Sequence, residues 1–124
     1  MGSVKEDKIP LVYSCSGCSS AAQMANALAV RLDRAGLAEM SCIAGVGGGV
    51  KPLVKKAGST EDIIVIDGCP LKCSVACLKN QNLKPKVEIE LSQWGVAKTY
   101  HQDFSEEEMQ ASYLKVVELI KQSF

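Results

Sequence analysis

Six cysteines are the residues whose type and spacing could do chemistry in this chain of 124 residues. They are Cys15, Cys18, Cys42, Cys69, Cys73 and Cys77. Each lies near the end of an expected strand or the start of an expected helix. In a cytosolic protein, cysteines are more typical of metal binding or redox chemistry than of a disulfide framework, because the cytosol keeps thiols reduced.

One stretch contributes two of these cysteines and organises the expected fold. Residues 63–67 are apolar up to a final aspartate, without alternation, which predicts a strand buried on both faces in the middle of a parallel sheet. A Gly-Cys-Pro turn follows, and Pro70 suits the first position of a helix. We therefore expect a helix over residues 71–79, with Cys69 near its N-cap and Cys73 one turn in. The partial positive charge of the helix N-terminus favours thiolate over thiol.

The rest of the chain alternates strand-like and helix-like patterns. Strands are expected over residues 9–13, 37–43 and 86–91, and helices over residues 21–35 and 50–57 and after the capping box at residues 105–108. Residues 92–104 have no clear pattern, and residues 1–7 are expected to form a flexible tail. This order predicts a single α/β domain over residues 1–124, a three-layer, Rossmann-like sandwich with a mostly parallel sheet of about four strands.

The expected sheet would bring four cysteines together. Cys15, Cys42 and Cys69 each follow a predicted strand, and the carboxyl ends of parallel strands meet at one edge, where ligands bind. Cys73 joins them from the start of the next helix. Four thiolates are a ligand set that tetrahedral zinc uses.

Two further cysteines leave the ligand set open. Cys18 lies within reach, because Cys15-x-x-Cys18 brackets a turn from strand to helix. Cys77 lies one turn beyond Cys73 and is interpreted first as a small packing residue. There are thus six candidates for four positions.

Other candidate residues have plainer interpretations. The glycine cluster at residues 45–49 lacks the Gly-Lys-Ser/Thr ending of a phosphate-binding loop, so a flexible or close-packed connection is favoured over a nucleotide site. Asp67 is interpreted as a turn-former. His101 is expected to be an exposed loop residue, and Trp94 a packing residue.

Charge and hydropathy exclude several classes of partner. Fourteen acidic and fourteen basic residues cancel, without a basic patch, so neither nucleic acid nor an anionic membrane is an expected partner. No apolar run is long enough to cross a bilayer, and the first residues are too polar for a signal peptide. We expect a cytoplasmic protein whose partner is a metal ion, and the sequence names no protein partner.

The cysteine motifs also carry a resemblance. The matching residues are Cys15-Ser16-Gly17, Gln23, Cys42-x-Ala44-Gly45-x-Gly47 and Asp67-Gly68-Cys69-Pro70-x-x-Cys73. They resemble the DGC domain family, whose members are described as zinc-binding. The resemblance implies four chelating cysteines, Cys15, Cys42, Cys69 and Cys73, and zinc as the cofactor. The chain departs from the usual pattern at Cys18 and Ala22, and the family has no assigned reaction.

These observations lead to one preferred function and two alternatives. We expect a small cytosolic zinc-binding protein with a cysteine cluster and no assigned biological role. The first alternative is a thiol redox enzyme that uses Cys15 and Cys18. The second is an iron–sulfur cluster carrier, since four thiolates suit iron as well as zinc. Whether the chain is an enzyme stays open.

Overall fold

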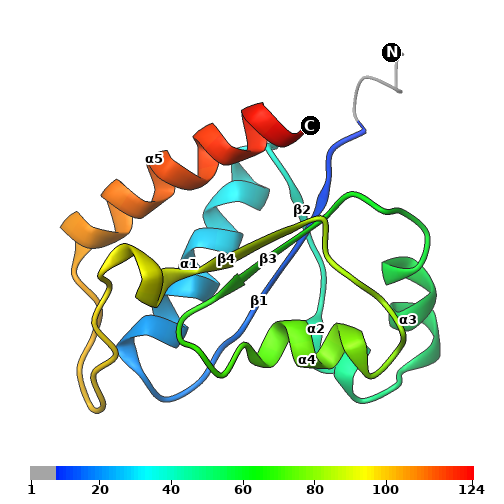
Figure 1. The fold of residues 1–124 in the computed structure, drawn as a ribbon, viewed down its shortest axis with the longest axis horizontal. Helices are drawn as coiled ribbons and strands as arrows, with labels where there is room; N and C mark the ends of the chain where they lie inside the picture. Colours follow the sequence, from blue (N-terminus) through cyan, green and yellow to red (C-terminus); the bar gives the residue numbers. More distant parts are fainter. Residues whose placement is uncertain (1–7) are drawn as a thin grey trace.

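The fold is built on one parallel sheet (Figure 1). The computed structural model describes residues 8–124, and the expected tail at residues 1–7 lies outside them. The strands are β1 (Leu11–Ser14), β2 (Glu39–Met40), β3 (Ile63–Asp67) and β4 (Val87–Glu90), in the spatial order β2-β1-β3-β4. Every neighbouring pair is parallel, which confirms the predicted α/β class.

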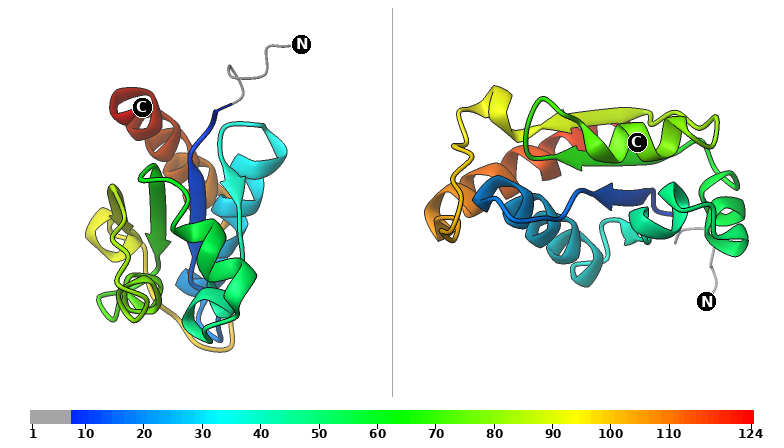
Figure 2. Two further views of the ribbon diagram at one scale, coloured as in Figure 1. Left: turned by 90° about the vertical axis from the view of Figure 1, so that its right-hand side faces the viewer. Right: turned by 90° about the horizontal axis from the view of Figure 1, so that it is seen from below.

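Helices cover both faces of the sheet. They are α1 (Ser20–Arg34), α2 (Ile43–Gly47), α3 (Lys51–Ala57), α4 (Cys73–Lys79), the short 3₁₀ helix η2 (Leu91–Trp94) and α5 (Glu106–Ser123). Helices α1 and α5 lie on one face, and α2, α3 and α4 lie on the other (Figures 1 and 2). The buried apolar residues accordingly form two clusters, one on each side of the sheet. The three predicted layers are confirmed.

Strand β3 is the centre of the sheet, as its sequence predicts. It pairs with β1 on one side and β4 on the other, and all five of its residues are buried. Ile64 and Ile66 face the cluster under α1 and α5, whereas Ile63 and Val65 face the cluster under α2, α3 and α4. Because both faces are covered, the strand has no polar alternation.

The two long helices both begin with a serine cap, of which the one at Ser105 was predicted from the capping box. Ser19 Oγ accepts a hydrogen bond of 3.1 Å from the backbone N–H of Ala22 at the start of α1. Gly36, just beyond its end, has a φ of 75°, a conformation that favours glycine. Ser105 Oγ accepts a bond of 3.1 Å from the N–H of Glu108 at the start of α5.

Several expected boundaries differ in the structure, beginning with the first strand, which is expected over residues 9–13 and observed at Leu11–Ser14. The helix expected over residues 71–79 begins at Cys73, and Pro70 lies in the preceding turn rather than at the first helical position. The strand expected over residues 37–43 shortens to Glu39–Met40, because the chain turns into α2 with Cys42 as its N-cap. The strand expected over residues 86–91 ends one residue earlier, where η2 begins.

The strand order places a topological switch point between β1 and β3. From β1 the chain moves outward to β2, and from β3 it moves outward in the opposite direction to β4. In open α/β sheets, ligands bind beyond the carboxyl ends of the strands at such a point. The residues that follow β1 and β3 are therefore the first to examine.

Candidate metal centre

Cys15 and Cys69 lie beside the switch point, and the turn that carries Cys69 is hydrogen-bonded to Cys15. Cys15 directly follows β1, and its N–H donates to the carbonyl oxygen of Ile66 at 3.2 Å. Its Sγ accepts a bond of 3.3 Å from the N–H of Gly68, next to Cys69. The turn after β3 is thus attached to the sulfur that ends β1.

Gly68 is required by close packing in this turn. A Cβ at this position would lie 2.7 Å from the carbonyl carbon of Ala21, in the first turn of α1. That separation is far below van der Waals contact and involves backbone atoms that cannot move aside. The glycine of the Asp-Gly-Cys triplet therefore lets the turn pass directly over the start of α1.

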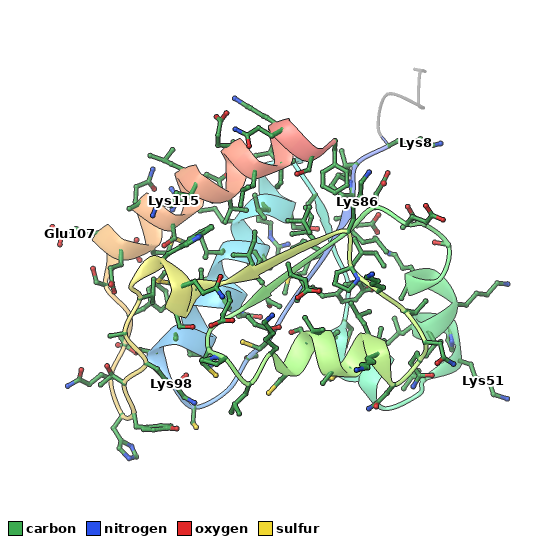
Figure 3. The ribbon with its side chains drawn as sticks, viewed as in Figure 1. Lys8, Lys51, Lys86, Lys98, Glu107 and Lys115 are labelled. Carbon is green, nitrogen blue, oxygen red and sulfur yellow. The ribbon has the colours of Figure 1, made fainter. Side chains whose placement is uncertain are left out.

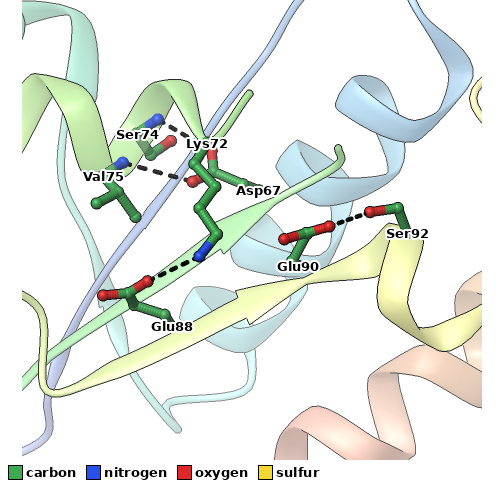
Figure 4. Close-up of polar contacts among 7 residues, drawn as sticks. All are labelled: Asp67, Lys72, Ser74, Val75, Glu88, Glu90 and Ser92. Carbon is green, nitrogen blue, oxygen red and sulfur yellow. Dashed lines mark hydrogen bonds and ion pairs between the residues drawn. The ribbon is translucent and has the colours of Figure 1, made fainter. Parts of the chain in front are cut away.

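Asp67, rather than a thiolate, satisfies the start of α4 (Figure 4). Its side chain is 1% exposed, and its oxygens accept bonds of 3.0 Å from the N–H of Ser74 and 3.4 Å from the N–H of Val75. The N-cap position itself is taken by Lys72, which has a φ of 51° and no capping side chain. The expectation that Cys69 lies near the helix N-cap is wrong, because the Asp67 carboxylate accepts the hydrogen bonds from the free N–H groups at the start of α4.

Charged side chains on the neighbouring strand border the same turn. Lys72 Nζ lies 3.3 Å from Glu88 Oε1 on β4, so the residue before Cys73 is paired with the sheet edge (Figure 4). Glu90, at the carboxyl end of β4, accepts a hydrogen bond from the hydroxyl of Ser92. The first contact joins the turn to Glu88, opposite the middle of β3, whereas the second lies at the carboxyl end of β4.

Two partly buried thiols are held in the neutral form. Burial, with smaller contributions from the neighbouring Asp67, Cys73 and Cys69, raises the pKa of Cys15 to about 11, against the lowering effect of the Gly68 N–H. Burial also raises the pKa of Cys77, with smaller contributions from Cys73 and Asp67. These mutual effects place Cys15, Cys69 and Cys73 in one neighbourhood at the end of the sheet.

The other cysteines occupy three different surroundings. Cys42 is exposed, and its Sγ accepts a bond of 3.4 Å from the N–H of Gly45 at the start of α2. Cys18 is exposed in the loop before α1. Cys77 is half-buried where α4 packs on α2, since a Cβ at Gly47 would lie 2.6 Å from its sulfur. The packing interpretation of Cys77 agrees with this contact.

The donor set suits a soft metal by its chemistry. Thiolates are the ligands that zinc and iron–sulfur clusters prefer. Within residues 8–124, no three His, Cys, Asp or Glu side chains are already grouped closely enough to hold a metal ion. Binding would have to draw the thiols together, and the turn at residues 68–72, between β3 and α4, is the irregular segment that carries Cys69. The identity of the ligands stays a prediction.

Lys98, which the sequence pattern did not indicate as a site residue, contacts Cys69. Lys98 Nζ lies 3.6 Å from Cys69 Sγ and 5.6 Å from the centroid of the Tyr100 ring. The hydroxyl of Tyr100, and next the thiol of Cys69, raise the pKa of Lys98. Residues 92–104 carry no periodic signal, so this contact is visible only in three dimensions.

The remaining candidates agree with their plainer interpretations. His101 is exposed, and Trp94 packs against the apolar cluster under α1 and α5. In the glycine cluster, Gly45 and Gly47 lie in α2 rather than in a connection, and a Cβ at Gly45 would lie 2.0 Å from Leu53, so this part of the cluster is close-packed. In the described part of the chain, no helix is long and apolar enough to cross a membrane.

Comparison with known proteins gives two matches. The DGC domain family matches residues 11–116. The chain is also 48% identical over 115 residues to a protein of Pseudomonas aeruginosa described as "Anaerobic and virulence modulator AnvM", covering 93% of this chain and 88% of that protein. No solved structure matches this chain.

Proposed function

Because this chain belongs to the DGC domain family, we propose that it is a small regulatory protein that binds zinc through thiols at the carboxyl edge of its sheet. The regulatory part is supported by the name of its relative, which describes a modulator. The zinc part is supported by one observation: the turn that carries Cys69 is attached to Cys15 at the switch point, through the bond from the Gly68 N–H to Cys15 Sγ. That is where this class of sheet binds ligands.

Four thiols would hold the ion. Cys15, Cys69 and Cys73 share one neighbourhood, and Cys42, after β2 at the same edge, would supply the fourth. Bound zinc would stabilise the deprotonated form of its thiol ligands, which would offset the raised pKa of Cys15. The chain contributes the positions of the sulfurs and the hydrogen bonds from Gly68 and Gly45 that support two of them.

The redox alternative is less well supported. A dithiol catalyst attacks through a thiol of lowered pKa. Burial instead raises the pKa of Cys15 to about 11. Cys15 is therefore a poor attacking group at neutral pH, and a metal site, where the ion itself stabilises the thiolates, makes better use of it.

Metal analysis of the reduced, untagged protein tests the proposal. After incubation with zinc sulfate and removal of free metal, about one zinc per chain is expected, because four thiolates complete one tetrahedron. Cys69→Ser and Cys73→Ser should each lose most of the bound zinc, whereas Cys77→Ser, the control, should keep it. A wild-type content below about a tenth of this stoichiometry would contradict the proposal, and a brown protein with iron and sulfide would favour the cluster carrier.

A further inference from the structure

We propose that Lys98 is a positioning residue of the thiol site, whose ammonium group offsets the negative charge that gathers at Cys69 when the thiols bind a metal ion. The contact that carries this inference is the distance of 3.6 Å between Lys98 Nζ and Cys69 Sγ. The inference rests on the proposed function and extends it to a residue outside the cysteine motifs. It also gives a role to the irregular segment between η2 and α5.

Hydrogen bonds to Ser20 hold the segment that carries Lys98. The Ser20 hydroxyl accepts a bond of 3.0 Å from the N–H of Thr99 and donates one of 3.3 Å to the carbonyl oxygen of Ala97. The N–H of Ser20 in turn donates to the carbonyl oxygen of Thr99 at 2.8 Å. Ser20 is buried at the start of α1, so both neighbours of Lys98 are attached to a rigid element. The position of Lys98 over the turn after β3 is therefore built into the fold.

Among residues 8–124, no carboxylate forms an ion pair with Lys98. The ion pairs formed within residues 8–124 use Arg34, Lys56, Lys72 and Lys86 as their cations. Lys98 instead lies near the Tyr100 ring and Cys69. Its charge is thus available to the sulfur.

The sign of the effect follows from counting charges. Four neutral thiols that release their protons to bind one divalent zinc become a group with a net charge of about −2. A cation near one of the sulfurs stabilises that product more than it stabilises the neutral thiols. For an exposed ammonium group at this separation, removal of the charge should weaken binding roughly tenfold.

Two variants of Lys98 and one matched control test this. Lys98→Met removes the charge and Lys98→Arg keeps it. Lys115→Met is the control, because Lys115 also lies over an aromatic ring, 5.2 Å from the centroid of Trp94, but on α5 away from the thiols (Figure 3). Zinc affinity is measured at fixed pH by competition with a chromophoric chelator, and thiolate ligation by the absorption of added cobalt(II). Lys98→Met should bind zinc roughly tenfold more weakly, and the other two variants like the wild type.

Salt separates a charge effect from a structural one. Coulomb interactions of an exposed group are screened within a few ångströms at about 1 M salt. The difference in zinc affinity between the wild type and Lys98→Met should therefore become smaller at this salt concentration. A gap that persists at high salt, or a Lys98→Met variant that binds as well as the wild type, overturns the inference while the proposed function stands. A wild-type protein that binds neither zinc nor cobalt(II) overturns both.

Discussion

At the scale of single residues, two opposing effects act on the protonation of Cys15 at the carboxyl end of the sheet. Burial and the carboxylate of Asp67 favour neutral Cys15, whereas the N–H of Gly68 donates to its sulfur. Cys69, in contrast, has the ammonium group of Lys98 within 3.6 Å. Cys15 and Cys69 therefore differ in their charged neighbours, and substitutions at the two positions should have different effects.

The stability of the metal-free protein should fall as pH rises from about 9 to about 11. The pKa of Cys15 is raised from its ordinary value of 9.0 to about 11, so in this window the folded chain holds a proton that the unfolded chain has lost. Stability decreases with pH wherever the folded state binds more protons. Urea unfolding at a series of pH values should show a shallower fall for Cys15→Ala than for the wild type.

Cys18→Ala is the matched control for this measurement. Cys18 is exposed in the same loop, so its removal should leave the pH dependence unchanged. The stability of Cys15→Ala should still depend on pH to some extent, because burial also raises the pKa values of Tyr13 and Cys77. Identical slopes for Cys15→Ala and Cys18→Ala would show that Cys15 is not the responsible group.

Replacing Asp67 with Asn should destabilise the protein by about 1–2 kcal/mol, the usual cost of losing a charged helix cap. The carboxylate is 1% exposed and accepts two bonds at the start of α4, one of which the amide of Asn cannot replace. Chemical denaturation measures the change. Glu88→Gln, which removes an exposed acid that pairs with Lys72, serves as the control and should change stability by about 0.5 kcal/mol or less.

At the scale of elements, the sequence predicts long or strongly patterned segments and misplaces short ones. Strand β3 and helices α1 and α5 carry continuous apolar runs, caps or periodic faces, and each was predicted within a few residues. Helix α2 has five residues, three of them apolar and two glycine, and was not predicted as a helix. It is stabilised by packing on α4, which no local pattern records.

The sequence likewise predicts one part of the candidate site and misses another. The cysteines that follow β1, β2 and β3 could be placed at one sheet edge from topology alone, and the structure puts them there. The contact between Lys98 and Cys69 joins residues 29 positions apart through an irregular segment, so it has no sequence signal. The start of α4 was misplaced because a buried carboxylate from the preceding strand decides it.

The packing of α2 on α4 predicts a coupling between Gly47 and Cys77. A methyl group at Gly47 would lie 2.6 Å from Cys77 Sγ, so Gly47→Ala should destabilise the protein by about 1–3 kcal/mol. In a Cys77→Ala background the sulfur is gone, and the same change should cost much less. A double-mutant cycle by urea denaturation measures the coupling.

The Cys18→Ala variant provides a control background for this double-mutant cycle. Cys18 is exposed and distant from α2 in the chain, so Gly47→Ala should keep its full cost when combined with Cys18→Ala. Equal costs in the Cys77→Ala and Cys18→Ala backgrounds would mean that Cys77 does not limit the approach of the two helices.

At the scale of the whole molecule, the apolar cores lie beside the thiol site rather than around it. One buried cluster fills the space between the sheet and the α1–α5 layer, and the other fills the opposite side. Cys15 packs against the edge of the first cluster, whereas Cys42 and Cys73 are exposed. The sheet thus has two covered faces that do not depend on a metal ion.

The metal-free, reduced protein should therefore keep its secondary structure. A closed metal site can supply on the order of 10 kcal/mol of apparent folding energy, and small modules that depend on it unfold when the metal is removed. This chain has two apolar cores and two capped long helices, so removal of zinc by a chelator should leave its circular dichroism spectrum nearly unchanged. Amide exchange should instead slow on zinc addition in residues 14–20, 42–50 and 67–73, which carry the candidate ligands. Global loss of helix on chelation would identify zinc as a purely structural ion, and exchange that is unaffected by zinc in all three segments would contradict a thiol metal site.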